Sequence, residues 1–303
     1  MAGRRTVPGI AEVRSVVAAH LPGYRVESVG TLGAGVDNLA YEVNGELIVR
    51  FQTVPDPARV AAETRLLGTV AGVSPLPVPV PVFTDPQRGC LAYRKLPGVP
   101  LLDLPGQRWS AHARSIAGTL GELLAALHAI PVDRLAGLVD LDDYPLTEWL
   151  REAADTYRTV TGQVPAAHRR PIEAFLAAPP PPEPPADRYA PVFSHNDLGI
   201  EHVLVDPETW SVTGVIDWSD AAIVDPAYDF GLLHRDLGPA AVDAALRDYR
   251  AGTDLEGLRR RAGCYARCTV FEDLAYGIES GRHAYVEKSL AALEWLFPAP
   301  AGA

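Results

Sequence analysis

The first third of this chain and the remainder carry different hydrophobic patterns, and this difference constrains the fold more than any other feature. Residues 24–53 alternate apolar and polar side chains in short runs, and the pair Asn44-Gly45 interrupts them with a strong hairpin signal. Beyond Pro100 the apolar residues recur at every third or fourth position, as in residues 112–130, which predicts helices. We therefore expect an antiparallel sheet followed by a mostly helical part.

One helix and one turn complete the expected first part. Residues 56–72 have apolar side chains at helical spacing, begin with Asp-Pro and end with Gly, which predicts a helix with both ends marked. Residues 89–100 indicate a strand that runs into the turn Leu96-Pro97-Gly98, where the composition changes. We place the boundary between two domains at this turn. The predicted domains are residues 1–96 and 97–303.

Composition narrows the class of protein. The chain has 303 residues, of which 48% are hydrophobic, enough to build a large core. Its formal net charge is −11 and no run is rich in Lys and Arg, so we expect neither nucleic-acid binding nor a polybasic membrane patch. The negative field instead attracts cations. We find no apolar window near the roughly 20 residues that a membrane helix needs.

Targeting signals and cysteines both favour the cytoplasm. An arginine pair near the N-terminus resembles an export signal, but Glu12 and Arg14 interrupt the apolar segment that should follow. Three cysteines, Cys90, Cys264 and Cys268, are too few and too unevenly placed for a disulfide framework. The last two share a helix face, so half of a metal site is conceivable, but no second Cys/His pair has ligand spacing. We expect buried thiols.

The segment FSHNDLGIEHVLVD, residues 193–206, concentrates polar side chains between two apolar runs. His195, Asp197 and His202 lie within eight residues, and Asp217 follows Asp197 by twenty, at the edge of another strand-like run. Aspartates in such places are usually paired, hydrogen-bonded or metal-bound. The spacing fits a phosphoryl-transfer centre, in which one carboxylate orients the attacking hydroxyl and another holds a divalent cation. The alternative is a structural polar turn.

This segment and the one that follows resemble a known family. HND at residues 195–197, then His202, then VIDWSDAAIVDPAYDF at residues 215–230 resemble the catalytic core of aminoglycoside and macrolide phosphotransferases, small-molecule kinases related to protein kinases. The family pattern is H-x-D-x-x-x-x-N, then I-D-W and D-P-x-x-D. His202 occupies the Asn position, which resembles the aminoglycoside 2''-phosphotransferase branch and macrolide kinases. LAYEVNGELIVRF, YRKLPGVPL and FEDLAYGIESG extend the resemblance over most of the chain.

The resemblance implies an α+β, bilobal, protein-kinase-like fold, with a small antiparallel-sheet N-terminal lobe that binds nucleotide and a larger, mostly helical C-terminal lobe for catalysis and substrate. It implies that Asp197 is the catalytic aspartate and that His195 organises its loop. It also implies that His202 and Asp217 bind Mg²⁺, although an imidazole leaves Mn²⁺ possible. We expect Asp229 to tether the catalytic loop rather than to take part in chemistry.

The resemblance also implies where the nucleoside triphosphate binds. Arg50 stands where the family has Lys, with Glu63 thirteen residues later on the first helix. A guanidinium binds phosphate oxygens in a fork and is not equivalent to an ammonium. We therefore expect the replacement of Lys by Arg to affect the catalytic rate. The alternative is that Arg50 is an exposed strand residue and that Glu63 lies on a solvated helix face. The other expected nucleotide contacts are Gly33 and Gly35 in a loop over the phosphates, and Tyr93, Arg94 and Leu96 beside the nucleobase. ATP and GTP both remain open.

The acceptor is expected to be a small hydroxylated molecule, bound by a monomer. An acidic protein suits a polycationic aminoglycoside. The candidate contacts are Asp236, Glu272, Asp273 and Tyr276. However, His234 and Arg235 stand near the expected acidic cluster, and aromatic side chains would equally suit a macrolide or pack in the core. A kinase of sugars or amino alcohols, and a catalytically weak nucleotide-binding protein with Arg50 in place of Lys, are the remaining alternatives.

Overall fold

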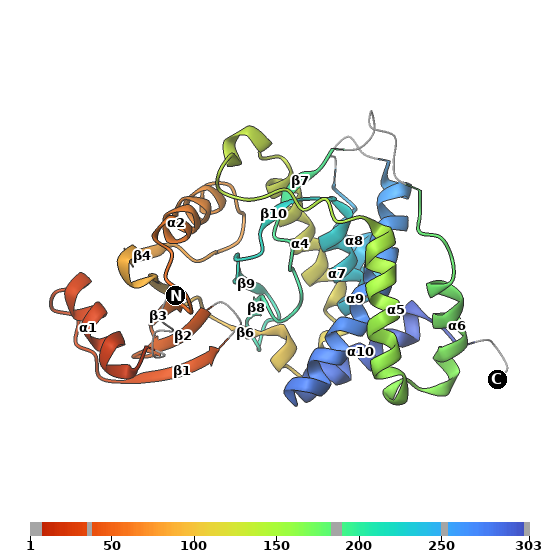
Figure 1. Ribbon diagram of the computed structural model, residues 1–303, viewed down its shortest axis with the longest axis horizontal. Helices are drawn as coiled ribbons and strands as arrows, with labels where there is room; N and C mark the ends of the chain where they lie inside the picture. The colour runs from red at the N-terminus through yellow and green to blue at the C-terminus, as the bar shows by residue number, and fades with distance from the viewer. Residues whose placement is uncertain (1–7, 35–37, 183–189, 250–253, 300–303) are drawn as a thin grey trace, which may run out of the picture. The chain divides into compact units, whose positions relative to one another are not determined.

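The computed structural model of the chain describes residues 8–34, 38–182, 190–249 and 254–299 (Figure 1). The chain divides into two compact units, Met1–Pro97 with Leu135–Val139, and Gly98–Arg134 with Asp140–Ala303. The first is built on an antiparallel sheet and the second mainly on helices. The expected change from strands to helices along the chain is confirmed.

The first unit contains a five-stranded antiparallel sheet with the strand order β1-β2-β3-β5-β4. Asn44 and Gly45 both have positive φ, 54° and 75°, and close the β2–β3 hairpin as the sequence predicts. The strands are β1 Val29–Ala34, β2 Asn38–Val43, β3 Leu47–Gln52, β4 Pro81–Asp85 and β5 Cys90–Arg94; the helices are α1 Ile10–His20 and α2 Pro57–Ala71.

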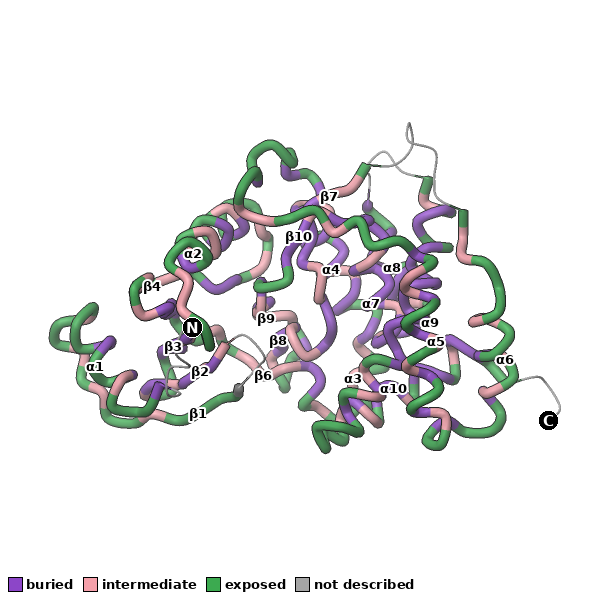
Figure 2. Tube along the Cα trace, viewed as in Figure 1, coloured by how far each residue is buried: buried purple, intermediate pink, exposed green. Residues whose placement is uncertain are grey.

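Two helices accompany this sheet. Helix α1 buries Val13, Val16 and Val17 in one cluster with strand residues that include Val49 and Phe51 (Figure 2). Helix α2 is the predicted one, and the Asp56 carboxylate caps it by accepting hydrogen bonds from two backbone N–H groups of its first turn. Helix α2 in turn contacts strands β4 and β5 of the sheet.

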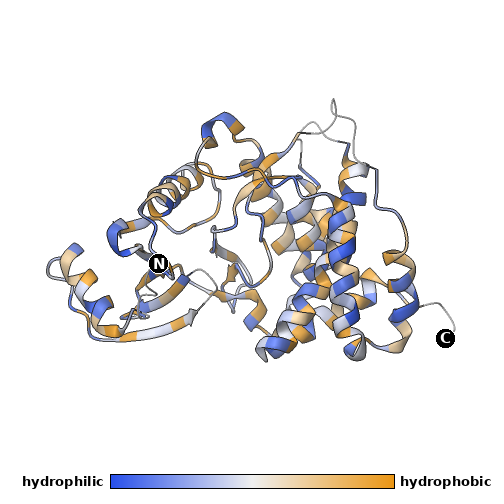
Figure 3. Cartoon of the chain, viewed as in Figure 1, coloured by the Kyte–Doolittle hydropathy of each residue, from blue (hydrophilic) through white to orange (hydrophobic). Residues whose placement is uncertain are grey.

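The second unit is organised around one long helix. Helix α9 contacts α5, α7 and α10, and it buries residues along its whole length. Figure 3 shows hydrophilic and hydrophobic bands on α5, whose buried residues recur at helical spacing. The helices are α3 Gly106–Trp109, α4 Ala113–His128, α5 Leu146–Val160, α6 Ala166–Leu176, α7 Ala227–Leu237, α8 Pro239–Ala245, α9 Leu255–Ser280 and α10 His283–Leu296.

Short strands in the second unit carry the loops of the HND segment. Antiparallel pairing joins β7 (Val192–Ser194) to β10 (Ala222–Val224), and joins β8 (Val203–Val205) to β6 (Val99–Pro100) and β9 (Val212–Val215). The loop between β7 and β8 therefore begins and ends on fixed strands. Among the described residues, no helix is long and apolar enough to cross a membrane. All three cysteines are buried free thiols, as expected.

A buried histidine connects three elements next to that loop. His128 ends α4, and its ring lies 2.6 Å from the Tyr249 hydroxyl and 3.1 Å from Ser194 Oγ. Its edge faces the Phe230 ring of α7. Burial lowers the pKa of His128 to about 3, so the ring is neutral in the folded protein.

We predict that this histidine makes the protein sensitive to acid. Its contribution to stability is complete above pH 6.5 and is lost as the pH falls towards 3, because only the unfolded chain takes up the proton. The free energy of unfolding should fall by about 1.4 kcal/mol per pH unit from this group. Urea unfolding at pH 7 and pH 5 should show a pH dependence that is about 2 kcal/mol smaller for His128→Gln than for the wild type. Equal pH dependence would contradict the assignment.

Candidate active site

One buried carboxylate holds the loop that follows β7. Asp229, in the first turn of α7, is fully buried. It accepts hydrogen bonds from the Ser194 hydroxyl, from the Asn196 backbone N–H at 2.9 Å and from the Leu198 backbone N–H at 3.1 Å. Two amides of the turn, which would otherwise be buried without an acceptor, are thereby satisfied. The expected role of Asp229 as a tether is confirmed.

The tether fixes an unusual backbone conformation beside Asp197. Asn196 has a φ of 62°, in the left-handed region that few residues other than glycine adopt. Its side-chain amide donates to Asp142 Oδ2 at 3.2 Å. The loop is thus held from both sides, and the neighbouring Asp197 side chain keeps 40% of its surface exposed.

His195 faces away from this exposed edge. It is fully buried, its Nε2–H donates to the Ile216 carbonyl at 3.0 Å, and its ring packs on Trp218 with centroids 4.6 Å apart. Burial lowers its pKa, which keeps the ring neutral. These contacts give His195 the position of a loop-organising residue, because they connect the loop to the chain just before Asp217.

Asp197 and His202 form a close pair at the surface of the loop. His202 Nε2 lies 3.0 Å from Asp197 Oδ2. Burial by itself would lower the pKa of His202, but the hydrogen bond to Asp197 and nearby carboxylate charges raise it to about 9. Among those charges are Glu201 and Asp217. Without a cation, His202 is therefore a protonated donor to Asp197.

The donor atoms around this pair suit a divalent cation. Within the described ranges, one group of potential ligands is close enough to hold a metal: Asp197, Glu201 and His202, with ligand atoms within 4.8 Å of one another. Asp217 is outside this group but is near enough for its charge to raise the pKa of His202 and, with Asp197, that of the partly desolvated Asp220. Carboxylates match the oxygen preference of Mg²⁺, whereas the imidazole must first lose its proton.

An acidic cavity opens between α5 and α9. Its volume is about 300 Å³, and its lining includes Trp149, Glu152, Asp155 and Glu272. Loss of water around the carboxyl raises the pKa of Glu272; the charge of Arg235 opposes this shift and that of Asp197 adds to it. Three carboxylates thus line this cavity. Glu152 and Asp155 also pair with Arg151, whereas Glu272 is close enough to Asp197 for the two charges to interact.

Trp149 also lines a second cavity of about 250 Å³, together with three tyrosines and three aspartates. Its lining includes Tyr144, Tyr228 and Tyr265, whose rings lie 5.4–6.0 Å from that of Trp149. Its lining also includes the buried pair of Asp225 and Arg261, joined by two hydrogen bonds of 2.7 and 3.1 Å. This cavity therefore offers aromatic surface together with charged groups.

In the first unit, Arg50 and Glu63 form the expected pair. Arg50 Nη1 lies 3.0 Å from Glu63 Oε1, and both side chains are largely buried, at 12% and 18% exposed. Neither the exposed-strand nor the solvated-helix alternative applies to them. Of the other predicted nucleotide contacts, Gly33 and Arg94 are exposed, Tyr93 is buried and Leu96 is half-buried, whereas Gly35 lies outside the described residues.

A comparison with protein families decides the membership of the chain. The model of the phosphotransferase enzyme family matches residues 28–264, which include the Arg50–Glu63 pair and the whole tethered loop. The chain belongs to the phosphotransferase enzyme family.

Two curated relatives match less of the chain than the family model does. An aminoglycoside 3'-phosphotransferase from Streptomyces fradiae is 29% identical over 204 residues, 58% of this chain and 67% of that protein. The uncharacterized protein YcbJ from Bacillus subtilis is 39% identical over 66 residues, and the chain covers only 21% of its length.

Solved structures of phosphotransferases share the fold over nearly the whole chain. The GDP complex of aminoglycoside 2'-phosphotransferase-IIIa is 24% identical with a TM-score of 0.66, covering 94% of this chain and 97% of that one. The macrolide 2'-phosphotransferase MphH from Brachybacterium faecium is also 24% identical, with a TM-score of 0.61 and coverage of 94% and 98%. The predicted kinase-like α+β fold of this phosphotransferase is thereby confirmed.

Not all predicted acceptor contacts gather in the phosphotransferase site. Glu272 lines the acidic cavity, but Tyr276, 45% exposed, packs with Arg282 and Tyr285 instead. The prediction of a direct contact at Asp236 needs correction, because this carboxylate is buried and accepts hydrogen bonds from Arg235 and from a loop amide. The same applies to Asp273, which pairs with Arg235 and Lys288.

Other residues near the loop were missed by the sequence-based prediction. Asp142 precedes helix α5 in a region without a motif, and Glu201 lies inside the HND segment without an obvious role. Burial would raise the pKa of Glu201, but Lys288 opposes this and the net effect lowers it to about 2. Only the three-dimensional structure brings Lys288, in the last helix, close to that carboxylate.

We predict that Asp229 is a large contributor to stability. Asp229→Asn replaces one acceptor oxygen by a donor that faces other donors, so the free energy of unfolding should fall by about 3 kcal/mol. The control Asp243→Asn changes an exposed carboxylate paired with Arg259 and should cost less than about 0.5 kcal/mol. Chemical denaturation measures both. Equal losses would contradict the tether.

Proposed function

We propose that this chain transfers the γ-phosphate of ATP or GTP to a hydroxyl group of an aminoglycoside. The observation that carries this proposal is the exposed Asp197 carboxylate on a rigid loop, within electrostatic reach of an acidic cavity. Aminoglycosides are polycations with many hydroxyl groups, so the cavity would bind the charges and present a hydroxyl to Asp197. Related structures support this choice, since one contains both GDP and kanamycin.

In this proposal Asp197 orients the acceptor hydroxyl and accepts its proton. His195 and Asp229 hold the loop, and the Trp149 face supports the ring system of the acceptor. His202 and Asp217 would hold a divalent cation, together with water. When bound, Mg²⁺ or Mn²⁺ would neutralise the charge on the nucleotide phosphates.

The nucleotide contacts are proposed from the first unit. The Arg50 guanidinium, oriented by Glu63, would bind phosphate oxygens in a fork. Gly33 and Gly35 would let a loop approach the phosphates, and Tyr93, Arg94 and Leu96 would flank the base. Both nucleotides are retained, because a related structure contains ATP with streptomycin and others contain GDP.

A macrolide is the second candidate acceptor. The observation that favours it is the second cavity, where the rings of Trp149, Tyr228 and Tyr265 would pack against a large ring system. A macrolide 2'-phosphotransferase also shares the fold. The carboxylates of the neighbouring cavity weigh for the aminoglycoside.

Two substitutions should separate catalysis from nucleotide binding. Asp197→Ala should reduce phosphate transfer from radiolabelled ATP at least about 10³-fold with nucleotide affinity little changed, because Asp197 serves the hydroxyl. Asp217→Ala should instead weaken cation-dependent nucleotide binding, measured by calorimetry. If both variants lost nucleotide affinity alike, the two roles would be wrongly assigned.

The acidic cavity makes a separate prediction about the acceptor. Glu272→Gln removes one negative charge, so KM for kanamycin should rise about fivefold to tenfold, as expected for the loss of about 1 kcal/mol of attraction. KM for an uncharged acceptor should not change. Glu256→Gln is the control, because Glu256 lies on the same helix with its side chain 83% exposed. Equal effects of the two variants on kanamycin would exclude the cavity as the acceptor site.

A further inference from the structure

Beneath the loop that carries Asp197 lies a group of charged side chains that the proposed reaction does not use. We call it the ion cluster. Its five members come from the loop and from helices α7, α9 and α10: Glu201, Arg235, Asp236, Asp273 and Lys288. Three carboxylates face two cations, and all five side chains are at most 13% exposed. Charges so deeply buried require close partners, because each would otherwise lose its hydration without compensation.

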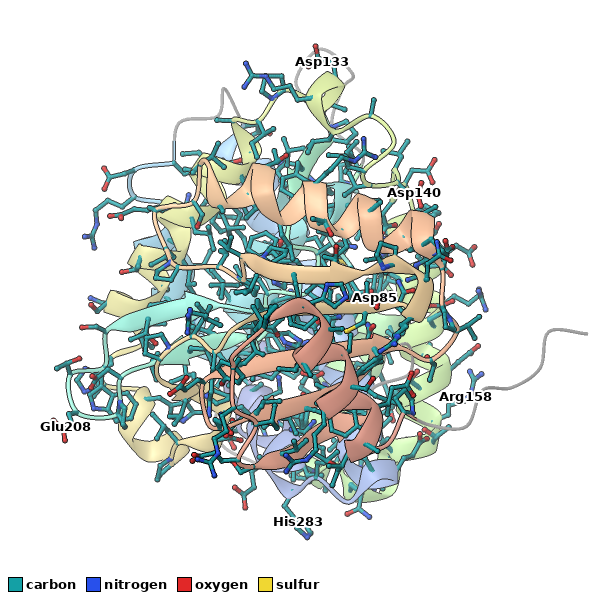
Figure 4. All side chains as sticks on the ribbon, turned by 90° about the vertical axis from the view of Figure 1, so that its left-hand side faces the viewer. Asp85, Asp133, Asp140, Arg158, Glu208 and His283 are labelled. Atoms are coloured by element: carbon teal, nitrogen blue, oxygen red, sulfur yellow. The ribbon has the colours of Figure 1, made fainter. Side chains whose placement is uncertain are left out.

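Lys288 is the centre of the ion cluster. Helix α10 directs His283 outwards (Figure 4) and Lys288 inwards, where its side chain is only 2% exposed. The Lys288 ammonium lies 2.8 Å from Glu201, 2.9 Å from Asp273 and 3.4 Å from Asp236. It donates hydrogen bonds to Glu201 and Asp236, and it forms an ion pair with Asp273.

The loop is shaped to let Glu201 reach this ammonium. The Glu201 carboxylate folds back against Gly199, and a Cβ at that position would lie 2.6 Å from Glu201 Oε1. Glycine removes this clash. In addition, the Ile200 backbone N–H donates to Asp236 Oδ2 at 3.1 Å, so the same part of the loop is bound to the ion cluster through its backbone.

Glu201 also has an alternative partner. Its carboxylate lies within 4.8 Å of the ligand atoms of Asp197 and His202, close enough to join them around a cation. Mg²⁺ in phosphate-transfer sites usually takes one or two carboxylates and leaves its other positions to water and phosphate oxygens. A further carboxylate would compete with those oxygens.

We propose that Lys288 is a positioning residue, which holds the Glu201 carboxylate beneath the loop and so excludes it from the cation site. The proposal rests on the function proposed above, because it presumes a cation at His202. It explains why a lysine far along the chain is buried under the loop.

The test measures binding of Mn²⁺ alone to the full chain by electron paramagnetic resonance of the free ion. Glu201→Gln should leave the Mn²⁺ affinity unchanged within about twofold, because the wild-type carboxylate is not a ligand. Lys288→Met should tighten Mn²⁺ binding about tenfold by releasing Glu201. The double variant should return to the wild-type value, and Lys288→Arg, which keeps the charge, should stay near it.

Several results would overturn the proposal. A tenfold loss of Mn²⁺ affinity in Glu201→Gln would make Glu201 a ligand, and this variant decides the question even if Lys288→Met does not fold. A folded Lys288→Met variant with wild-type affinity, or a wild type that binds no Mn²⁺, would also refute it. Because neither nucleotide nor acceptor is present, a failure to phosphorylate aminoglycosides would leave these outcomes unaffected.

Discussion

The geometry of the site depends on the carboxylate of Asp229. A loop that turns sharply between two buried strands leaves backbone amides in the interior, and these need acceptors that no strand partner supplies. Asp229 supplies them from the first turn of α7, where it is fully buried. The left-handed conformation of Asn196, with φ of 62°, is tolerated because this anchor and the contact with Asp142 fix it on both sides. The backbone beside Asp197 is thereby held, while the Asp197 side chain stays 40% exposed and pairs with His202.

Ion pairs fix the opposite side of the loop. The ion cluster joins Gly199–His202 to three helices, and Arg235 and Lys288 offset most of the charge on its carboxylates. Burial raises the pKa of Asp273. Arg235 and Lys288 offset only part of this shift, so the pKa is about 6. Because three carboxylates face two cations, one negative charge is in excess. A proton on Asp273 can compensate it. The loop is thus fixed by the Asp229 carboxylate on one side and by the ion cluster on the other.

Much of the fold could be predicted from local patterns, whereas the supports of the site could not. The Asn44-Gly45 hairpin and the helix Pro57–Ala71 follow from residue types at fixed short spacing. The tether at Asp229, 33 residues from Asn196, was expected from the motif that the chain shares with the family. Asp236 and Asp273 were expected to face an acceptor, but both pair with Lys288 instead. The sequence could not show this, because helical spacing alone does not say which neighbour covers a carboxylate. Their partner Lys288 is 87 residues from Glu201 in sequence, and no periodicity connects the two. Pairing of distant charges is decided by tertiary packing, which one sequence does not reveal.

Phosphate transfer to a cationic acceptor is tested most directly by offering the purified chain several acceptors side by side. Radiolabelled ATP and GTP would be incubated with kanamycin, a macrolide and a small amino alcohol, and kcat/KM would be measured for each product. We expect labelled kanamycin, with a kcat/KM at least about tenfold above the other acceptors. Label in the macrolide or the amino alcohol alone, or in no acceptor at all, would contradict the proposed function.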